Sequence, residues 1–242
     1  MNREREFPML SKLIARLDRA ERRLRYSFGD NITDPAQRRW SALHVNLFDH
    51  AFLRTIWTNF WQIAPGVYRS NQPTHRRFEK YAAMGIKTVI NLRGEDPRAH
   101  YLFEKESCDA LGLTLIDVKL HARQLYSADK FLAALEAMRT AEKPMLIHCK
   151  SGADRTGIMA AIYLMVVEGK PVEEAQKQLS LKYIHLKCTK TGVQDYMLDV
   201  YAARNAHRPI GFEDWLRTEY NHKRLQSGFD GGVPAEDMAF PQ

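Results

Sequence analysis

The ten residues HCKSGADRTG occupy positions 148–157, and the apolar run PMLI stands directly before them. A short apolar run of this kind predicts a buried strand, and the apolar segment TGIMAAIYLM at its far end predicts a helix. A strand that ends in a tight, glycine-containing loop and continues as a helix aims its backbone N–H groups into one concavity, next to the positive end of the helix dipole. The stretch therefore predicts an anion site between a strand and a helix.

Two side chains of this loop suit phosphate transfer. The guanidinium of Arg155 can hold two oxygens of a phosphoryl group in a planar fork. Cys149 starts the loop, among the N–H groups, Arg155 and the helix N-terminus, so we expect its pKa to lie below the ordinary value of about 8.5. A thiolate that faces a bound phosphate is a nucleophile. The Walker pattern G-x-x-x-x-G-K-[ST] is absent, which argues against a loop that cradles a nucleotide.

Other residues of the loop are expected to support this chemistry. His148 is placed to orient the backbone at the cysteine, and Thr156 is placed to donate a hydroxyl hydrogen bond to the sulfur when it leaves. Gly152 permits a close backbone approach and a positive φ. The residues expected to line the bound substrate are Lys150, Ser151, Gly152 and Ala153, with the Lys150 charge at the rim.

Around the loop, short apolar runs alternate with helical patterns. Strands are expected at 66–70, 86–93, 113–120 and 144–149, and helices at 73–85, 97–111, 127–141 and 156–169. Strands separated by helices of this length predict an α/β fold, with a parallel-type central sheet flanked by helices. Arg69 and Arg93 follow expected strands, so both are candidates for the same sheet edge as the loop.

The two ends of the chain depart from this alternation. Residues 8–25 have the pattern of a basic amphipathic helix, and residues 40–66 are rich in aromatic residues and expected to be helical and largely buried. We expect residues 1–62 to be a helical extension packed on the core, and residues 63–225 to be a catalytic domain that ends in further helices. Residues 226–242 contain three acids, no Lys or Arg, and several Gly and Pro residues, which predicts a disordered tail.

Composition narrows the choice of partners. A net charge of +7 and a pI near 9.3 suit an anionic ligand. We expect a phosphorylated protein, a phospholipid or an inositol phosphate as substrate, no nucleic acid, and a peripheral membrane contact through residues 8–25. Three cysteines without a paired framework indicate a reducing compartment, and no apolar leader or membrane span is evident, so we expect the cytoplasm. The spacing of the histidines indicates no metal site.

The pattern H-C-x5-R-[ST] on a strand, loop and helix resembles the signature of the cysteine-dependent protein tyrosine and dual-specificity phosphatases. VYRSNQP (67–73) and GIKTVINLRGE (85–95) resemble bacterial members of the compact dual-specificity type. The resemblance implies a two-step hydrolysis without metal or cofactor, in which Cys149 takes the phosphoryl group as a phosphocysteine and water then releases phosphate.

The same resemblance implies phosphotyrosine as substrate, together with phosphoserine or phosphothreonine. A phosphoinositide or an inositol phosphate, hydrolysed by the same mechanism, is the alternative. A non-catalytic phosphate-binding module and a rhodanese-like sulfur transferase are further alternatives, and Arg155 followed by Thr156 favours phosphate over sulfur transfer.

The general acid that protonates the leaving oxygen does not stand where most members of the family carry it. They place an aspartate in the loop after the strand that precedes the active-site strand, whereas the segment LHARQLYSADK (120–130) has none at its start. Bacterial phosphatases with the pattern C-x-x-G-x-D-R-T and myotubularin-type lipid phosphatases are proposed to use the loop aspartate, which implies Asp154. Asp117 is the alternative and His121 a further candidate, whereas Asp129 suits a helix N-terminus.

Overall fold

The computed structural model describes residues 31–49 and 51–240. Contacts divide the chain into two compact units, Met1–Thr55 with Asp96–Phe103, and Ile56–Glu95 with Glu104–Gln242. The predicted basic helix at residues 8–25 lies outside the described residues. The predicted boundary at residue 62 falls inside a strand of the larger unit, so this unit begins earlier than the sequence indicates.

Among the described residues, two helices precede the sheet along the chain, α2 (Pro35–Phe48) and α3 (Leu53–Ile56). Helix α2 begins where the sequence changes from a polar loop, because the Asp34 side chain accepts a hydrogen bond of 2.8 Å from the backbone N–H of Gln37 and Pro35 suits the first turn. The prediction that residues 40–66 are largely buried is wrong for this part, where several large apolar side chains are at least 43% exposed: Trp40, Leu43, Leu47, Phe52, Leu53 and Ile56.

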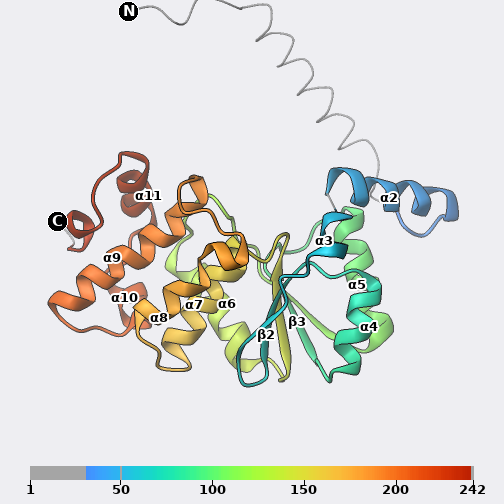
Figure 1. The fold of residues 1–242 in the computed structure, drawn as a ribbon, viewed down its shortest axis with the longest axis horizontal. Helices are drawn as coiled ribbons and strands as arrows, with labels where there is room; N and C mark the ends of the chain where they lie inside the picture. Colours follow the sequence, from blue (N-terminus) through green and yellow to red (C-terminus); the bar gives the residue numbers. More distant parts are fainter. Residues whose placement is uncertain (1–30, 50, 241–242) are drawn as a thin grey trace, which may run out of the picture. The chain divides into compact units, whose positions relative to one another are not determined.

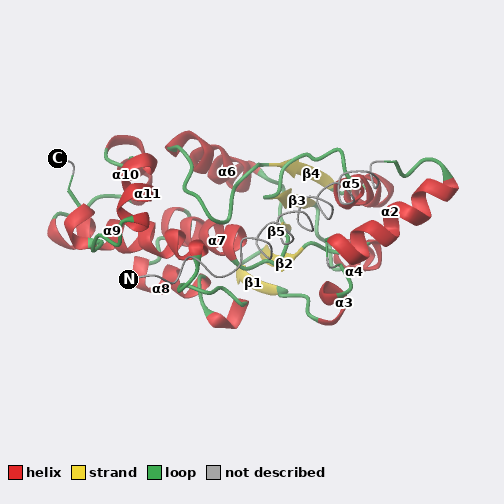
Figure 2. Cartoon of the chain, turned by 90° about the horizontal axis from the view of Figure 1, so that it is seen from above, coloured by secondary structure: helices red, strands yellow, loops and turns green. Residues whose placement is uncertain are grey.

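The larger unit is built on a five-stranded sheet with the strand order β1-β2-β5-β3-β4 (Figures 1 and 2). The strands are β1 (Trp61–Ala64), β2 (Val67–Asn71), β3 (Thr88–Asn91), β4 (Thr114–Asp117) and β5 (Met145–Cys149). All neighbours pair in parallel except β1, which runs antiparallel to β2. The sequence prediction of a largely parallel α/β sheet is confirmed.

Strand β1 corrects one prediction, because its residues belong to the segment that was expected to be helical. Trp61 pairs with Arg69 across the hairpin, and the turn between the strands contains Gly66 with φ +70°. The four residues of β1 are too few to separate a strand from a helix by periodicity. Pairing with β2 decides the conformation.

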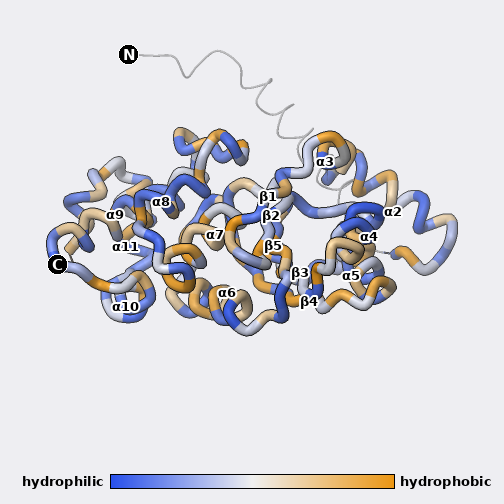
Figure 3. Tube along the Cα trace, turned by 60° about the horizontal axis from the view of Figure 1, so that its bottom comes forward, coloured by the Kyte–Doolittle hydropathy of each residue, from blue (hydrophilic) through white to orange (hydrophobic). Residues whose placement is uncertain are grey.

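Helices cover both faces of this sheet (Figures 1 and 3). On one face, α4 (His75–Ala83) and α5 (Ala99–Leu111) bring Phe78 and Cys108 against Val89 of β3. On the other face, α6 (Ala128–Thr140) and α7 (Asp154–Val166) join the large core that includes residues of β2, β3 and β5. Crossovers between parallel strands place helices in this way.

The chain ends in helices that extend the core next to α7. They are α8 (Val172–Ala175), α9 (Val193–His207), α10 (Phe212–Thr218) and α11 (His222–Asp230), with short 3₁₀ turns between them. The side chain of Trp215 is only 2% exposed within this core. None of the helices in the described part of the chain is long and apolar enough to span a membrane.

The predicted disordered tail is wrong for residues 226–240. These residues complete α11 and form a 3₁₀ turn at Glu236–Met238. The guanidinium of Arg224 donates to the carbonyls of Met238 and Phe240 at 3.1 and 2.6 Å, and the side chain of Met238 packs against the core. The composition suggests disorder, but these tertiary contacts order the segment.

Candidate active site

The loop predicted from the sequence lies at the carboxyl edge of the sheet, in its middle. Strand β5 ends at Cys149, whose neighbour on β2 is Asn71, and His148 has Asn91 of β3 beside it. Helix α7 begins at Asp154, so the predicted strand, loop and helix are all present. The carboxyl edge is where open parallel sheets bind ligands.

Three donors outside the loop fix the direction of its peptide groups. The backbone N–H of Gln72, the Nδ2 of Asn59 and the Nη2 of Arg69 donate to the successive carbonyls of residues 150–152, at 3.3, 3.2 and 2.6 Å. In a trans peptide the carbonyl and the following N–H point in opposite directions. The N–H groups that follow these carbonyls therefore point away from the three donors, to the open side of the loop, where an anion can bind. The last of them, that of Ala153, donates to Oγ of Ser151 at 3.3 Å within the loop.

Gly152 is required at its position for two reasons. Its φ is +72°, a conformation that L side chains rarely adopt. A Cβ atom there would lie 2.6 Å from the carbonyl carbon and oxygen of Ser70 and 2.7 Å from the N of Asn71. The loop therefore approaches β2 more closely than any other residue would allow.

Arg69 lies behind the loop and does not offer its terminal nitrogens to a ligand. Besides Gly152, it donates to the carbonyl and the side-chain oxygen of Gln178 at 3.0 and 2.6 Å. Its guanidinium carbon is 3.7 Å from the centre of the Tyr183 ring. Burial lowers the pKa of Arg69 to about 10, against the charges nearby that raise it. We infer that Arg69 braces the loop: by holding the Gly152 carbonyl on its own side, it keeps the following N–H group away from itself.

The Cys149 thiol has the electrostatic setting of a nucleophile. Its side chain is 1% exposed, and burial, the largest single effect, raises its pKa. The positive charge of Arg155 and the hydrogen bonding of the Thr156 hydroxyl and backbone N–H outweigh burial. The net effect is a pKa below the ordinary value for a thiol. This is the direction that favours a thiolate.

The terminal nitrogens of Arg155 make fewer hydrogen bonds within the protein than those of Arg69. Nη1 of Arg155 donates to the carbonyl of Leu120 over a long 3.4 Å, and its Nε, like that of Arg69, is buried with no hydrogen-bond partner among the described residues. Buried N–H donors are normally paired, because an unpaired one costs free energy. An anion held by the loop would satisfy this donor.

His148 is fully buried and faces away from the open side of the loop. Its Nε2 lies 2.5 Å from an oxygen of Glu104 on α5, and the other oxygen of Glu104 accepts a hydrogen bond of 2.5 Å from Gln72. Arg93 in turn donates to Gln72. Nδ1 of His148 lies 3.3 Å from the carbonyl oxygen of Cys149, and a role of His148 in orienting the backbone and supporting the thiolate stays a prediction. Glu104 was not predicted, because nothing in its local sequence marks a partner 44 positions away on β5.

Asp154 forms a chain of charged groups that the sequence did not reveal. Its Oδ1 is 2.8 Å from Nδ1 of His185, and Nε2 of His185 is 2.6 Å from Oδ2 of Asp195 on α9. The His185 side chain is fully buried, whereas that of Asp154 is 19% exposed. The Asp154 carboxyl group is therefore partly exposed, while its Oδ1 is held by the buried His185.

The other acid candidates differ in their surroundings, and of them His121 lines a cavity together with Arg155. Asp117 ends β4 and accepts a hydrogen bond of 2.8 Å from Nδ2 of Asn91. His121 stacks on Tyr126 at 4.9 Å, and burial, with the charges of Arg155 and Lys119, lowers its pKa. Asp129 stands in the first turn of α6, as the sequence indicates.

Two neighbouring cavities open at the loop. One of about 610 Å³ is lined by His121, Ala122, Arg123, Gln124, Arg155, Lys190, Gln226 and Asp230. The other, of about 400 Å³, is lined by Arg123, Asp154, Ile184, Leu186, Thr189, Lys190 and Thr191. Arg123 and Lys190 belong to both, so the approach to Arg155 and Asp154 is basic. The alternative acid Asp117 lines neither cavity.

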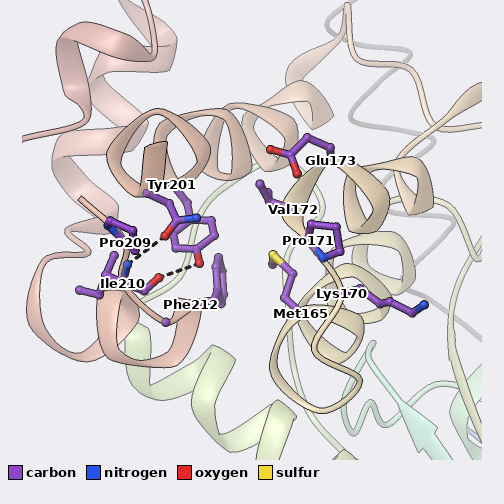
Figure 4. Close-up of a pocket in the computed structure, with 11 residues that line it drawn as sticks. Met165, Lys170, Pro171, Val172, Glu173, Tyr201, Pro209, Ile210 and Phe212 are labelled. Atoms are coloured by element: carbon purple, nitrogen blue, oxygen red, sulfur yellow. Dashed lines mark hydrogen bonds between the residues drawn. The ribbon is translucent and has the colours of Figure 1, made fainter. Parts of the chain in front are cut away.

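A third cavity, of about 450 Å³, lies between the end of α7, the start of α8 and the α9–α10 turn (Figure 4). Its wall includes Met165, Tyr201 and Phe212, and the Tyr201 hydroxyl donates to the carbonyl of Ile210 at 2.9 Å. No residue of the loop lines it. No cluster of three or more His, Cys, Asp or Glu side chains suited to a metal ion occurs in residues 31–49 and 51–240.

Known proteins resemble this chain over the same region. The family model described as "PTP-SAK: Swiss Army Knife protein, DSP-PTPase phosphatase domain" matches residues 59–193. The dual specificity protein phosphatase TpbA of Pseudomonas aeruginosa is 29% identical over 123 residues, which cover 50% of this chain and 53% of TpbA. The inositol diphosphatase DSP3 of Arabidopsis thaliana is 28% identical over 131 residues, which cover 52% of this chain and 64% of DSP3. The chain thus spans about half the length of TpbA.

A solved structure agrees with the fold. The crystal structure of P. aeruginosa TpbA in complex with pTyr matches with a TM-score of 0.50 at 22% identity, over 66% of this chain and 88% of that one. The likeness supports the predicted fold class, an α/β sheet flanked by helices.

Proposed function

The chain belongs to the Swiss Army Knife family of DSP-PTPase phosphatase domains, and from this premise we propose that it hydrolyses phosphomonoesters through a phosphocysteine on Cys149. The observation that carries the proposal is the thiol with a lowered pKa at the mouth of a loop whose N–H groups, together with Arg155, are oriented for an anion. Preorganised donors of this kind stabilise charge that develops in a transition state.

The proposed reaction has two steps. In the first, the Cys149 thiolate attacks phosphorus, the bond between phosphorus and the leaving oxygen breaks, and that oxygen takes a proton from a general acid. In the second, water attacks the phosphocysteine, the same group takes a proton from the water, and the sulfur leaves as a thiolate. Thr156, next to the sulfur, stabilises the departing thiolate in this scheme.

We assign the general acid to Asp154. It lies at the start of α7 and lines a cavity at the loop, whereas Asp117 is held by Asn91 and lines neither cavity. In the expected substrate site, residues 150–153 contribute their backbone N–H groups, and the Lys150 charge lies at the rim.

Phosphotyrosine is the proposed substrate, with phosphoserine and phosphothreonine as further ones. The matched relative TpbA, described as a dual specificity protein phosphatase, supports this choice. An inositol phosphate or a phosphoinositide is the second candidate, because Arg123 and Lys190 line both cavities and a polyphosphorylated ring would place further phosphates near them. The matched inositol diphosphatase of A. thaliana supports the second candidate.

The test measures phosphate release by the wild type and by Cys149→Ser, with a metal chelator present. The substrates are a phosphotyrosine peptide, a phosphoserine peptide, an inositol polyphosphate and phosphoinositide vesicles. We expect turnover by the wild type alone. The substrate that it prefers decides between a phosphatase for phosphorylated proteins and one for inositol phosphates or phosphoinositides. Equal turnover by both proteins would refute the thiolate mechanism, and phosphate-dependent binding without turnover would leave a binding module.

A further inference from the structure

His185 is buried between two carboxylates, and the reaction steps above do not yet use it. It stands on a segment of 3₁₀ turns after α8, and it contacts Asp154 at the start of α7 and Asp195 in the first turn of α9. The side chain is fully buried, with both ring nitrogens engaged. A histidine can donate from both nitrogens only as an imidazolium.

The backbone beside this histidine is in an uncommon conformation. Ile184 has φ +59° and ψ +31°, the left-handed region, where a β-branched residue is a genuine outlier. The carbonyl of the preceding Tyr183 accepts a hydrogen bond of 3.1 Å from Asn59, which also holds the loop at Ser151. The contacts around His185 therefore outweigh the conformational free-energy cost of the Ile184 backbone. Backbone outliers of this kind concentrate at functional sites.

We propose that His185, held by Asp195, is a positioning residue for the candidate acid Asp154: it occupies one carboxyl oxygen and leaves the other to face the bound phosphoryl group. This inference rests on the proposed phosphatase function. It adds a residue that the loop motif does not contain. Orientation matters because a carboxyl group a fraction of an ångström out of place loses much of its catalytic effect.

The assignment gives each oxygen of Asp154 its own task. Oδ1 accepts the hydrogen bond from Nδ1 of His185 throughout. Oδ2 carries the proton that the leaving oxygen takes when its bond to phosphorus breaks. It regains a proton when water attacks the phosphocysteine and the bond between sulfur and phosphorus breaks. The proton count closes over the two steps, and His185 stays protonated.

The charges around His185 keep it protonated at neutral pH. Burial, the largest effect, lowers its pKa, but the hydrogen bonds and charges of Asp154 and Asp195 raise it to about 9. Lys187 on the same segment faces Asp199 and acts on Asp195, and Arg69 and Cys149 act on the Asp154 side. The imidazolium therefore lies next to a carboxylate that the site needs both with and without a proton.

Two substitutions at residue 185 separate position from charge. An asparagine amide reaches about as far as Nδ1 of histidine, and a glutamine amide about as far as Nε2. His185→Asn can therefore still donate to Asp154, whereas His185→Gln keeps only the contact with Asp195, and both remove the positive charge. The readout is the ratio of kcat/KM for phenyl phosphate to that for a nitro-substituted aryl phosphate, because only a strongly basic leaving oxygen needs the acid.

We expect His185→Gln to lower this ratio by roughly ten- to a hundredfold and His185→Asn by only a few-fold. A ratio within one variant does not depend on the fraction of folded protein, so partial unfolding does not obscure the result.

Asp195→Asn should lower the ratio to an intermediate degree, because the ring then loses its second carboxylate. Asp199→Asn is the matched control: it lies on the same helix and accepts hydrogen bonds from Gln176 and Lys187, without contact to His185. A control that changed the ratio as much as Asp195→Asn would contradict the assignment.

The outcomes separate this inference from the proposed function. If Cys149→Ser abolishes turnover but the His185 variants lose activity on both aryl phosphates in parallel, His185 is only structural and the inference falls while the phosphatase stands. If the wild type releases phosphate from neither the aryl phosphates nor the peptide and inositol substrates, the proposed function falls and takes the inference with it. A ratio lowered more by Gln than by Asn supports both.

Discussion

The two sides of the loop use arginine in opposite ways. On the side that the loop's carbonyls face, both terminal nitrogens of Arg69 donate hydrogen bonds, to Gln178 and to the loop. The planar guanidinium lies over the ring of Tyr183. On the open side, the terminal nitrogens of Arg155 make one long hydrogen bond, to the carbonyl of Leu120. The Nε of each arginine is buried without a hydrogen-bond partner in the described part of the chain, so the contrast lies in the terminal nitrogens.

This difference shows how an arginine that shapes a site can be told from one that binds the ligand. Both lie close to the same ten residues and both carry a positive charge. Only the pairing of their terminal nitrogens separates them, because those of Arg69 are used within the protein, whereas those of Arg155 make a single long hydrogen bond. Substitutions on the two sides should therefore fail in different ways.

Arg155→Lys should have the largest effect. A lysine keeps the charge but not the fork that holds two phosphoryl oxygens, so we expect kcat/KM to fall by about 10³-fold. Thermal unfolding should change little, since Arg155 makes a single long hydrogen bond within the protein. Steady-state kinetics with the preferred substrate, together with a melting curve, measures both. A loss below tenfold would mean that Arg155 does not hold the phosphoryl group.

Arg69→Met should damage both stability and activity. The carbonyls of Gly152 and Gln178 lose a charged donor, and we expect the free energy of unfolding to fall by about 3 kcal/mol. Activity should fall by about a hundredfold, because the loop no longer holds its N–H groups in place. Arg76→Met, on the exposed face of α4, is the control. A stable but inactive Arg69→Met protein would contradict the bracing role.

Gly152→Ala tests the close approach of the loop to β2. Its Cβ would lie 2.6 Å from the Ser70 carbonyl, so the loop must shift and activity should fall by about tenfold or more. Gly85→Ala is the matched control, because Gly85 also has a positive φ, +87°, but no atom within 4 Å of the added Cβ. It should cost only about 1 kcal/mol and leave activity unchanged. Equal activity of the two variants would refute the steric argument.

Alkylation of Cys149 sharpens the comparison on the open side. Because its pKa lies below the ordinary value, its reaction with iodoacetamide should persist to lower pH than that of the exposed Cys188. Arg155→Gln removes the main charge that lowers the pKa, so the midpoint should move upward. Mass spectrometry of the peptides after timed labelling follows each thiol separately. An unmoved midpoint would mean that Arg155 does not support the thiolate.

A smaller effect is expected in the pH dependence of stability. The pKa of His185 is raised to about 9 from an ordinary 6.5, so protonation of this side chain stabilises the folded state. The contribution is complete below pH 6.5 and is lost as the pH rises through about 9. Denaturant unfolding of the wild type and of His185→Asn at several pH values should therefore show a difference that shrinks over this range. A constant difference would show that His185 does not titrate there.

The loop was predictable because its parts are contiguous. A strand, a glycine turn, Cys149 and Arg155 stand within a dozen residues, and the local pattern determines their geometry. The alternation of strands and helices from residue 66 also predicted the parallel core, since each element is long enough to show its period. Local sequence was sufficient wherever neighbours in the chain are neighbours in space.

The remaining features depend on contacts between distant residues. Glu104 of helix α5 contacts His148 of strand β5, and His185 contacts two carboxylates, one on α7 and one on α9. Strand β1 exists because β2 pairs with it, and residues 226–240 are ordered by contacts with the core. No period or local motif encodes such pairings, so they could not be predicted from the sequence.

The outward direction of the loop's carbonyls has a consequence for comparing and engineering related chains. The ten-residue stretch is not self-sufficient, because Asn59 and Arg69 orient it from outside. Grafted into another scaffold without these two donors, it would keep its nucleophile but lose the anion cradle. A homologue with an intact HCxxGxDRT stretch and an apolar residue in place of Arg69 would on the same ground lose most of its activity. The tripeptide YRS at 68–70 thus serves as a second signature, to be checked before activity is transferred by similarity.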